Sequence, residues 1–193
     1  MNLYLPDQLL SIHSAFDKDS IPHAFGGAIA FAYYGQPRAT SDIDINIALK
    51  VRQHGLVLDS LSALFAIPDR AGAEREIIRN AQVRLRWGHI PVDLFFSDIP
   101  FHESIAARTK EVDFMGTKIP IISAEDLIIL KSAYDRGKDW IDIENMFKVQ
   151  GPTLDEGYMT QWLGKFFDSE DERVRKIEGF IRAFGSSPGP ERR

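Results

Sequence analysis

Two aspartates, Asp42 and Asp44, stand one residue apart in a segment where Ile43, Ile45 and Ile47 alternate with polar residues. That alternation is the two-residue period of a half-buried strand. Residues i and i+2 share a face of a strand, so both carboxylates should project to the same side, roughly 6–7 Å apart. Two such anions repel each other unless a cation lies between them. Mg²⁺ prefers oxygen ligands, so the spacing predicts a magnesium site.

A glycine pair, Gly26 and Gly27, precedes the aspartates at an expected junction between a strand and a helix. Glycine at such a junction allows a positive φ and the close approach of a phosphate. The segment Ala28–Tyr34 is apolar on nearly all sides, which predicts a buried helix after the pair. A phosphate cradle followed by a metal-binding strand indicates a protein that handles a nucleoside triphosphate.

A third carboxylate, Asp93, lies in a strand predicted over His89–Phe96. A charge in so apolar a run is costly to bury unless it faces a cation or a polar cleft. If this strand neighbours that of Asp42 and Asp44, the three carboxylates can hold two metal ions about 3.5–4 Å apart. Such a site suits in-line phosphoryl or nucleotidyl transfer, in which positioning and charge neutralisation supply most of the catalysis. For Asp93 alone, an ordinary aspartate at a strand end is the alternative.

The composition bounds the class of protein. The 193 residues fit one domain, or one domain with a small helical appendage, and 44% of them are hydrophobic, which is enough for a sizeable core. Cysteine is absent, which excludes disulfides, thiolate zinc sites and cysteine nucleophiles. No window approaches the ~20 apolar residues of a membrane span, so we expect a cytoplasmic protein without a membrane partner.

The charged residues leave two interpretations open. The net charge of −5 argues mildly against a dedicated nucleic-acid coat, yet five arginines fall within seventeen positions: Arg70, Arg75, Arg79, Arg84 and Arg86. They form either a solvated helix and strand with alternating charges or a local basic surface for an RNA or a triphosphate. The five histidines show no metal-ligand spacing and are interpreted as surface or packing residues.

The succession of strands and helices predicts an α/β domain with a short mixed sheet, flanking helices and a helical C-terminal portion. We expect a core over residues 1–150, a helical appendage over 151–184, and a flexible tail over 185–193, which is rich in Gly, Ser and Pro. Between them Ser123 is a plausible N-cap of a helix that carries Lys131 in an apolar run. Lys131 is either a snorkelling surface residue or a buried charge aimed at an anion.

Several of these motifs together resemble a known family. Gly26-Gly27 is followed after fourteen residues by Asp42-x-Asp44, with Arg38-x-Thr40-Ser41 just ahead, and Lys131 precedes Lys138-Asp139 in the segment 120–143. This pattern resembles the AbiEii-like nucleotidyltransferases of the DNA polymerase beta-type superfamily, which include toxins of bacterial toxin–antitoxin systems. The matches span roughly residues 20–147.

The resemblance implies a polymerase beta-type nucleotidyltransferase fold and roles for nine residues. The implied metal ligands, which are also catalytic, are Asp42, Asp44 and Asp93. The implied nucleotide-binding residues are Gly26, Gly27, Arg38, Ser41 and Lys131. Asp139 is an implied active-site acid. The alternative for Arg38 is that it pairs with a carboxylate of the site, and Ser41 at a strand start needs no function.

The expected reaction moves a nucleoside monophosphate from an NTP, ATP among the candidates, onto an acceptor hydroxyl with Mg²⁺ as cofactor. Three acceptors remain open: a tRNA 3′ end, a protein side chain, or a small molecule such as an antibiotic. An antitoxin is a possible protein partner. The alternative is a catalytically inactive nucleotide-binding or regulatory module with the same fold.

Overall fold

The computed structural model describes residues 4–185, which form two compact units. Unit 1 contains the described residues up to Ile29 together with Ala39–Ser123. Unit 2 contains Ala30–Arg38 and the described residues from Ala124 onward. Helix α2 (Gly27–Tyr34) begins in unit 1 and ends in unit 2.

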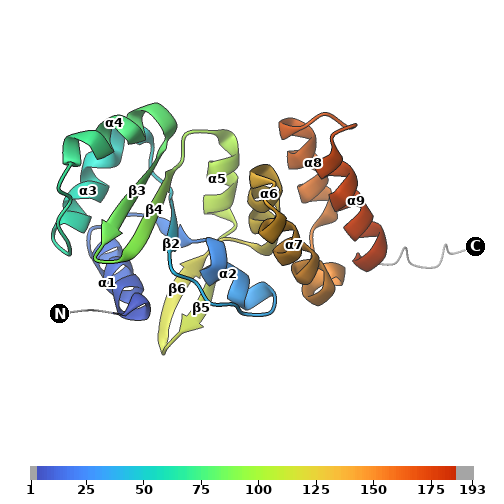
Figure 1. The fold of residues 1–193 in the computed structure, drawn as a ribbon, viewed down its shortest axis with the longest axis horizontal. Helices are drawn as coiled ribbons and strands as arrows, with labels where there is room; N and C mark the ends of the chain where they lie inside the picture. Colours follow the sequence, from blue (N-terminus) through green and yellow to red (C-terminus); the bar gives the residue numbers. More distant parts are fainter. Residues whose placement is uncertain (1–3, 186–193) are drawn as a thin grey trace, which may run out of the picture. The chain divides into compact units, whose positions relative to one another are not determined.

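Unit 1 combines six strands with helices (Figure 1). Its strands are β1 (His23–Phe25), β2 (Ile43–Ile47), β3 (Gln82–Trp87), β4 (Ile90–Phe96), β5 (Lys110–Phe114) and β6 (Thr117–Ile121). Its helices are α1 (Leu5–Lys18), the 3-10 turn η1 (Val51–Gln53), α3 (His54–Ser62), α4 (Arg70–Asn80) and α5 (Pro100–Ala107).

The six strands form one mixed sheet in the order β3-β4-β2-β1-β6-β5. Strand β2 is parallel to β4 and antiparallel to β1, while β1 is parallel to β6. The hairpins β3–β4 and β5–β6 supply the two antiparallel edges. The predicted α/β class with a short mixed sheet is therefore confirmed.

One face of the sheet is apolar and fixes the register of its central strands. The side chains that align across β2 and β4 on this face are at most 1% exposed: Ile43, Ile45, Ile47, Val92, Leu94 and Phe96. Each buried side chain of this size contributes about 1.5–3 kcal/mol. A slip of one residue would turn the whole apolar set to the other face. The core therefore also fixes which polar residues align on the opposite face.

Unit 2 is helical. Besides the end of α2 it contains α6 (Ala124–Tyr134), α7 (Gly137–Gln150), the 3-10 turn η2 (Gly151–Thr153), α8 (Glu156–Phe166) and α9 (Glu172–Phe184). Ile143 and Met146 of α7 are fully buried, and Phe147 stacks on Phe180 of α9 with ring centroids 5.4 Å apart. These contacts hold α9 against α7.

Helix α4 is the main element that the sequence analysis did not predict. Asp69 caps its start by accepting a hydrogen bond of 2.8 Å from the backbone N–H of Gly72, and Ala81 ends it with φ of 54°. Asp69 is a residue type that commonly caps helices. The many charged residues of α4, however, leave too few apolar positions for a helical period to be recognised in the sequence. Strand β3 follows directly and alternates buried Val83 and Leu85 with exposed Arg84 and Arg86.

The grouping by packing differs from the predicted division. Residues 124–150 pack with α8 and α9 in unit 2, whereas the predicted core ran to residue 150. The division into a functional core over residues 1–150 and an appendage over 151–184 therefore remains a prediction. The predicted tail lies outside the described residues from position 186. Between residues 4 and 185, no helix has the length and apolar character needed to cross a membrane.

Candidate active site

The turn between β1 and α2 is tied directly to the strand of the first two aspartates. The backbone N–H of Gly26 donates a hydrogen bond of 2.9 Å to the carbonyl oxygen of Asp44. Gly27 has φ of 51°, and a Cβ atom at this position would lie 1.7 Å from Asp44 Oδ2. Only glycine fits here, so the predicted glycine turn exists and lies against Asp44.

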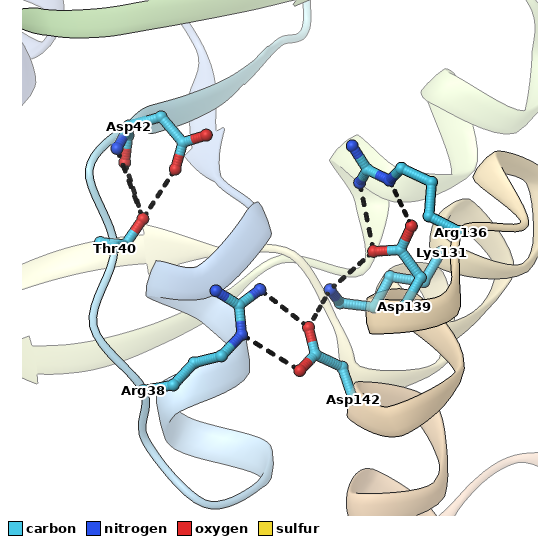
Figure 2. A network of polar contacts seen from close by, with 7 residues as sticks. All are labelled: Arg38, Thr40, Asp42, Lys131, Arg136, Asp139 and Asp142. Atoms are coloured by element: carbon cyan, nitrogen blue, oxygen red, sulfur yellow. Dashed lines mark hydrogen bonds and ion pairs between the residues drawn. The ribbon is translucent and has the colours of Figure 1, made fainter.

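The parallel pairing of β2 with β4 aligns Asp44 with Asp93. Aligned residues of neighbouring strands point to the same face, with backbones about 4.8 Å apart. Two carboxylates about 5 Å apart repel each other by about 3 kcal/mol at an effective dielectric constant of 20. Asp42 precedes β2, and its carboxylate accepts a hydrogen bond of 2.7 Å from the Thr40 hydroxyl (Figure 2). Unit 1 thus brings Asp44 and Asp93 together on its polar face.

Arg84 of β3 forms a two-pronged ion pair with Asp93. Its Nε and Nη2 atoms each donate a hydrogen bond of 2.7 Å to the Asp93 carboxylate, which is 7% exposed. Hydrogen bonding to Asp93 raises the pKa of the Arg84 guanidinium, and the charges of Asp93, Asp42 and Asp44 raise it further. Arg84 therefore lies within the electrostatic reach of all three predicted ligands.

The sequence analysis placed Arg84 only in the arginine cluster and missed this role. A signal existed in the hairpin, because Trp87 aligns with Ile90 across a two-residue turn. Counting back from that turn aligns Arg84 with Asp93.

Unit 2 contains a separate charge cluster centred on Asp142 of α7 (Figure 2). Arg38 donates hydrogen bonds of 3.1 and 2.9 Å to its two carboxylate oxygens, and Lys131 of α6 donates one of 2.6 Å. Burial by itself would raise the pKa of Asp142, but the hydrogen bonds and charges of Arg38 and Lys131 outweigh it and lower that pKa below its usual value. Arg38 thus pairs with Asp142, a carboxylate that was not among the predicted site residues.

Asp139 extends the same cluster by one turn of α7. It is fully buried, accepts hydrogen bonds of 2.5 and 3.1 Å from Arg136, and lies 3.5 Å from Lys131 Nζ. The Lys131 side chain is only 6% exposed, which excludes the snorkelling interpretation. Together with Arg38 and Asp142, the cluster holds three cations and two carboxylates, a net charge of +1. Ser41, by contrast, is simply exposed before β2.

The residues of unit 1 fit a magnesium ion. The donor set of Asp42, Asp44 and Asp93 consists of carboxylate oxygens alone, which is the chemistry that a hard divalent cation selects. The missing side chain at Gly27 lets the Asp44 carboxylate lie directly against the first turn of α2. Backbone N–H groups at a helix start attract an anion, so a metal-bound phosphate suits this position.

Comparisons with known proteins point to one family. A family model described as "Nucleotidyl transferase AbiEii toxin, Type IV TA system" matches residues 8–186. The structure is similar to that of ANT(2'')-Ia in complex with adenylyl-2''-tobramycin, with 15% identity, 93% of this chain and 95% of that chain covered, and a TM-score of 0.55. It is also similar to the lincomycin-bound lincosamide adenylyltransferase LnuA, with 16% identity, coverage of 77% and 99%, and a TM-score of 0.52.

These two likenesses concern the fold alone, and they agree with the mixed α/β architecture predicted from the sequence. No curated protein matches the chain in sequence.

We expect Gly27→Ala to destabilise the protein by about 1–3 kcal/mol, because the new Cβ must displace Asp44 and φ is positive. Urea denaturation followed by circular dichroism measures this change. Gly55→Ala is the matched control, because its Cβ meets nothing within 4 Å in α3. It should leave stability unchanged or raise it by up to about 1 kcal/mol. Equal stability of the Gly27 variant and wild type would contradict the close approach.

We expect Asp142→Asn to lower the free energy of unfolding by about 1–3 kcal/mol at pH 7, because Arg38 and Lys131 lose a charged acceptor. A carboxylate with a lowered pKa stabilises the fold above the pKa of the unfolded chain, and that stability is lost as the pH falls through the lowered pKa. The difference in the free energy of unfolding between wild type and Asp142→Asn should therefore become smaller below pH 4.

Denaturation curves between pH 2.5 and 7 test this dependence. Glu144→Gln on the same helix is the control, because the exposed Glu144–Lys148 pair should contribute less than about 0.5 kcal/mol. A difference for Asp142→Asn that does not change with pH would contradict the ion-pair account.

Proposed function

We propose that this chain, which belongs to the AbiEii nucleotidyl transferase family, moves a nucleoside monophosphate from a magnesium-bound NTP onto an RNA 3′ hydroxyl and releases pyrophosphate. The family makes the chain a nucleotidyltransferase. The metal, the acceptor and a toxin role are our proposals. The observation that supports them best is the alignment of Asp44 with Asp93 beside Gly27 on the polar face of unit 1.

The residues of unit 1 divide the work between binding and positioning. The triphosphate would lie at the start of α2, where Gly26 and Gly27 allow its close approach. Asp42, Asp44 and Asp93 would hold magnesium, which neutralises the triphosphate and lowers the pKa of the attacking hydroxyl. Asp93 would also accept the proton of that hydroxyl, and Arg84 holds both of its carboxylate oxygens in position.

The unit 2 cluster supports a second part of the proposal. Lys131 and Arg38 remain candidate contacts for an anionic group of the nucleotide, because their cluster carries one positive charge in excess. Asp139 is fully buried between Arg136 and Lys131, so we assign it the positioning of Lys131. Ser41 remains a candidate phosphate contact from the exposed start of β2.

An RNA acceptor is favoured by the arginines of β3. Arg84 and Arg86 alternate with buried residues on this edge strand, so they project from the same face as Asp93. Exposed guanidinium groups beside the carboxylates suit a phosphodiester backbone and oppose a polycationic small molecule. Antibiotics are the competing acceptors, since the similar structures named above are described with antibiotics or their adenylylated product.

The experiment offers each α-labelled NTP with Mg²⁺ to total RNA, to cell protein and to aminoglycoside and lincosamide antibiotics. We expect label on RNA, and a loss of at least 100-fold in rate for Asp44→Asn, because the carboxylate positions the metal-bound triphosphate. Glu111→Gln in the exposed strand β5 is the control and should retain full activity.

The other possible results of this experiment would lead to different conclusions. Label on an antibiotic or on protein would overturn the RNA acceptor and keep the reaction. No transfer to any acceptor, with nucleotide still bound, would support the regulatory module instead. The toxin role has its own readout: expression of the wild type should arrest bacterial growth, and Asp44→Asn should not.

Arg84 should set the metal requirement, because it and a magnesium ion compete for the oxygens of Asp93. We expect Arg84→Ala to lower the Mg²⁺ concentration for half-maximal activity about two- to tenfold, and to lower the maximal rate because Asp93 loses its support. A magnesium titration of the transfer reaction measures both values. Arg79→Ala on the exposed surface of α4 is the control. An unchanged magnesium requirement would contradict the competition.

A further inference from the structure

Three further side chains gather on the apolar face of unit 1. His23 of β1 aligns with Ile47 of β2, so its side chain points to the face opposite that of Asp44. His13 and Asp17 stand four residues apart on α1, where side chains are neighbours. The two histidines are 7% and 8% exposed, whereas Asp17 is largely exposed.

Hydrogen bonds determine which ring nitrogen of His23 carries the proton. Its Nδ1 atom lies 2.9 Å from the carbonyl oxygen of Ile21. A carbonyl oxygen can only accept, so Nδ1 carries the proton and the lone pair is on Nε2. That Nε2 atom lies 3.0 Å from His13 Nδ1, which must then be the donor. Bonding of one ring nitrogen to a backbone carbonyl is the arrangement that orients a metal-ligating histidine.

The same hydrogen bonds leave a lone pair of His13 facing the Asp17 carboxylate. With its proton on Nδ1, the neutral His13 ring has its lone pair on Nε2, which lies 3.5 Å from Asp17 Oδ2. Two lone pairs at this distance repel each other. A cation relieves the repulsion, and the candidates are a proton on His13 or a metal ion bound by the three side chains.

We infer that His13, Asp17 and His23 form a transition-metal site, with Zn²⁺ as the metal that the donors suit best. One ligand atom from each residue lies within 4.8 Å of the other two. A zinc ion about 2.0–2.2 Å from each donor would replace the proton between His13 Nδ1 and His23 Nε2, with the His13 proton moved to its own Nε2, and the exposed Asp17 side chain can rotate to complete the set. Two imidazoles and one carboxylate favour zinc over magnesium, which prefers oxygen ligands and retains water.

Three protein ligands leave a fourth coordination position for water or a small ligand. Asp17 and His23 also line a cavity of about 240 Å³ in unit 1, whose wall includes Asn46 and His102. This cavity gives a small molecule a route to the two ligands. The ion would join the end of α1 to the start of β1, so its binding free energy would add to the stability of unit 1.

The test uses the full chain after removal of metals by a chelator. We expect one Co²⁺ ion to bind with the visible absorption of a nitrogen and oxygen site, and Zn²⁺ to displace it. Zinc at 100 times its Kd should raise the Tm by about 5–10 °C. Asp17→Asn, which changes an exposed side chain, should weaken binding at least tenfold, and His23→Gln should abolish it. His89→Gln, on the exposed β3–β4 turn, is the control and should bind as wild type.

The Asp42→Asn/Asp44→Asn double variant separates this site from the carboxylates, and it should keep the Co²⁺ spectrum. Loss of the spectrum in that variant, or binding that survives both Asp17→Asn and His23→Gln, would overturn the inference. Absence of Co²⁺ and Zn²⁺ binding in the wild type would also overturn it. If His23→Gln does not fold, Asp17→Asn decides the result alone.

Discussion

Repulsion between Asp44 and Asp93 is the constraint on which the polar face of unit 1 depends. The apolar residues of β2 and β4 hold these carboxylates side by side, because any slip of register would expose the core. The packing of the core therefore maintains a repulsion between these two carboxylates that no local rearrangement can remove. Arg84 offsets part of it, and a divalent cation would offset the rest. Gly27 allows the Asp44 carboxylate to pack against the start of α2.

The charged residues of unit 2 are arranged differently, as a cluster of ion pairs. Its carboxylates and Lys131 are withdrawn from water, whereas Arg38 and Arg136 stay partly exposed. A buried ion pair contributes little to stability once desolvation is counted. Lys131 is held between Asp139 and Asp142 in one defined position, while Arg38 approaches Asp142 from the other side. Such a cluster is better suited to orienting a cation than to holding the fold together. Its single excess positive charge makes it attractive to a polyanion.

The two faces of the unit 1 sheet offer metal ions different chemistry. The face with Asp44 and Asp93 presents oxygen donors, and the face with His23 and His13 presents nitrogen donors beside one carboxylate. Residues one position apart on a strand point to opposite faces, so a single sheet separates the two sets completely. Selectivity between a hard and a borderline cation then follows from donor type alone.

Local pattern was enough to predict much of this protein. Alternation around Ile45 predicted β2, the glycine pair predicted the turn, and their spacing together with the segment around Lys131 resembles the family to which the chain belongs. The α/β class followed from the order of the elements. These features depend on residues close together in the chain, whose periodicity and backbone freedom are written directly in the sequence.

Contacts between distant segments required the folded chain. The pairing of Arg38 with Asp142 spans 104 residues, and the approach of His13 to His23 depends on how α1 packs on β1. The alignment of Asp44 with Asp93 arises from a parallel pairing that no local turn specifies. In each case the partner is selected by the register and packing of the core. Those are properties of the whole domain, because burying the apolar face determines which polar groups meet.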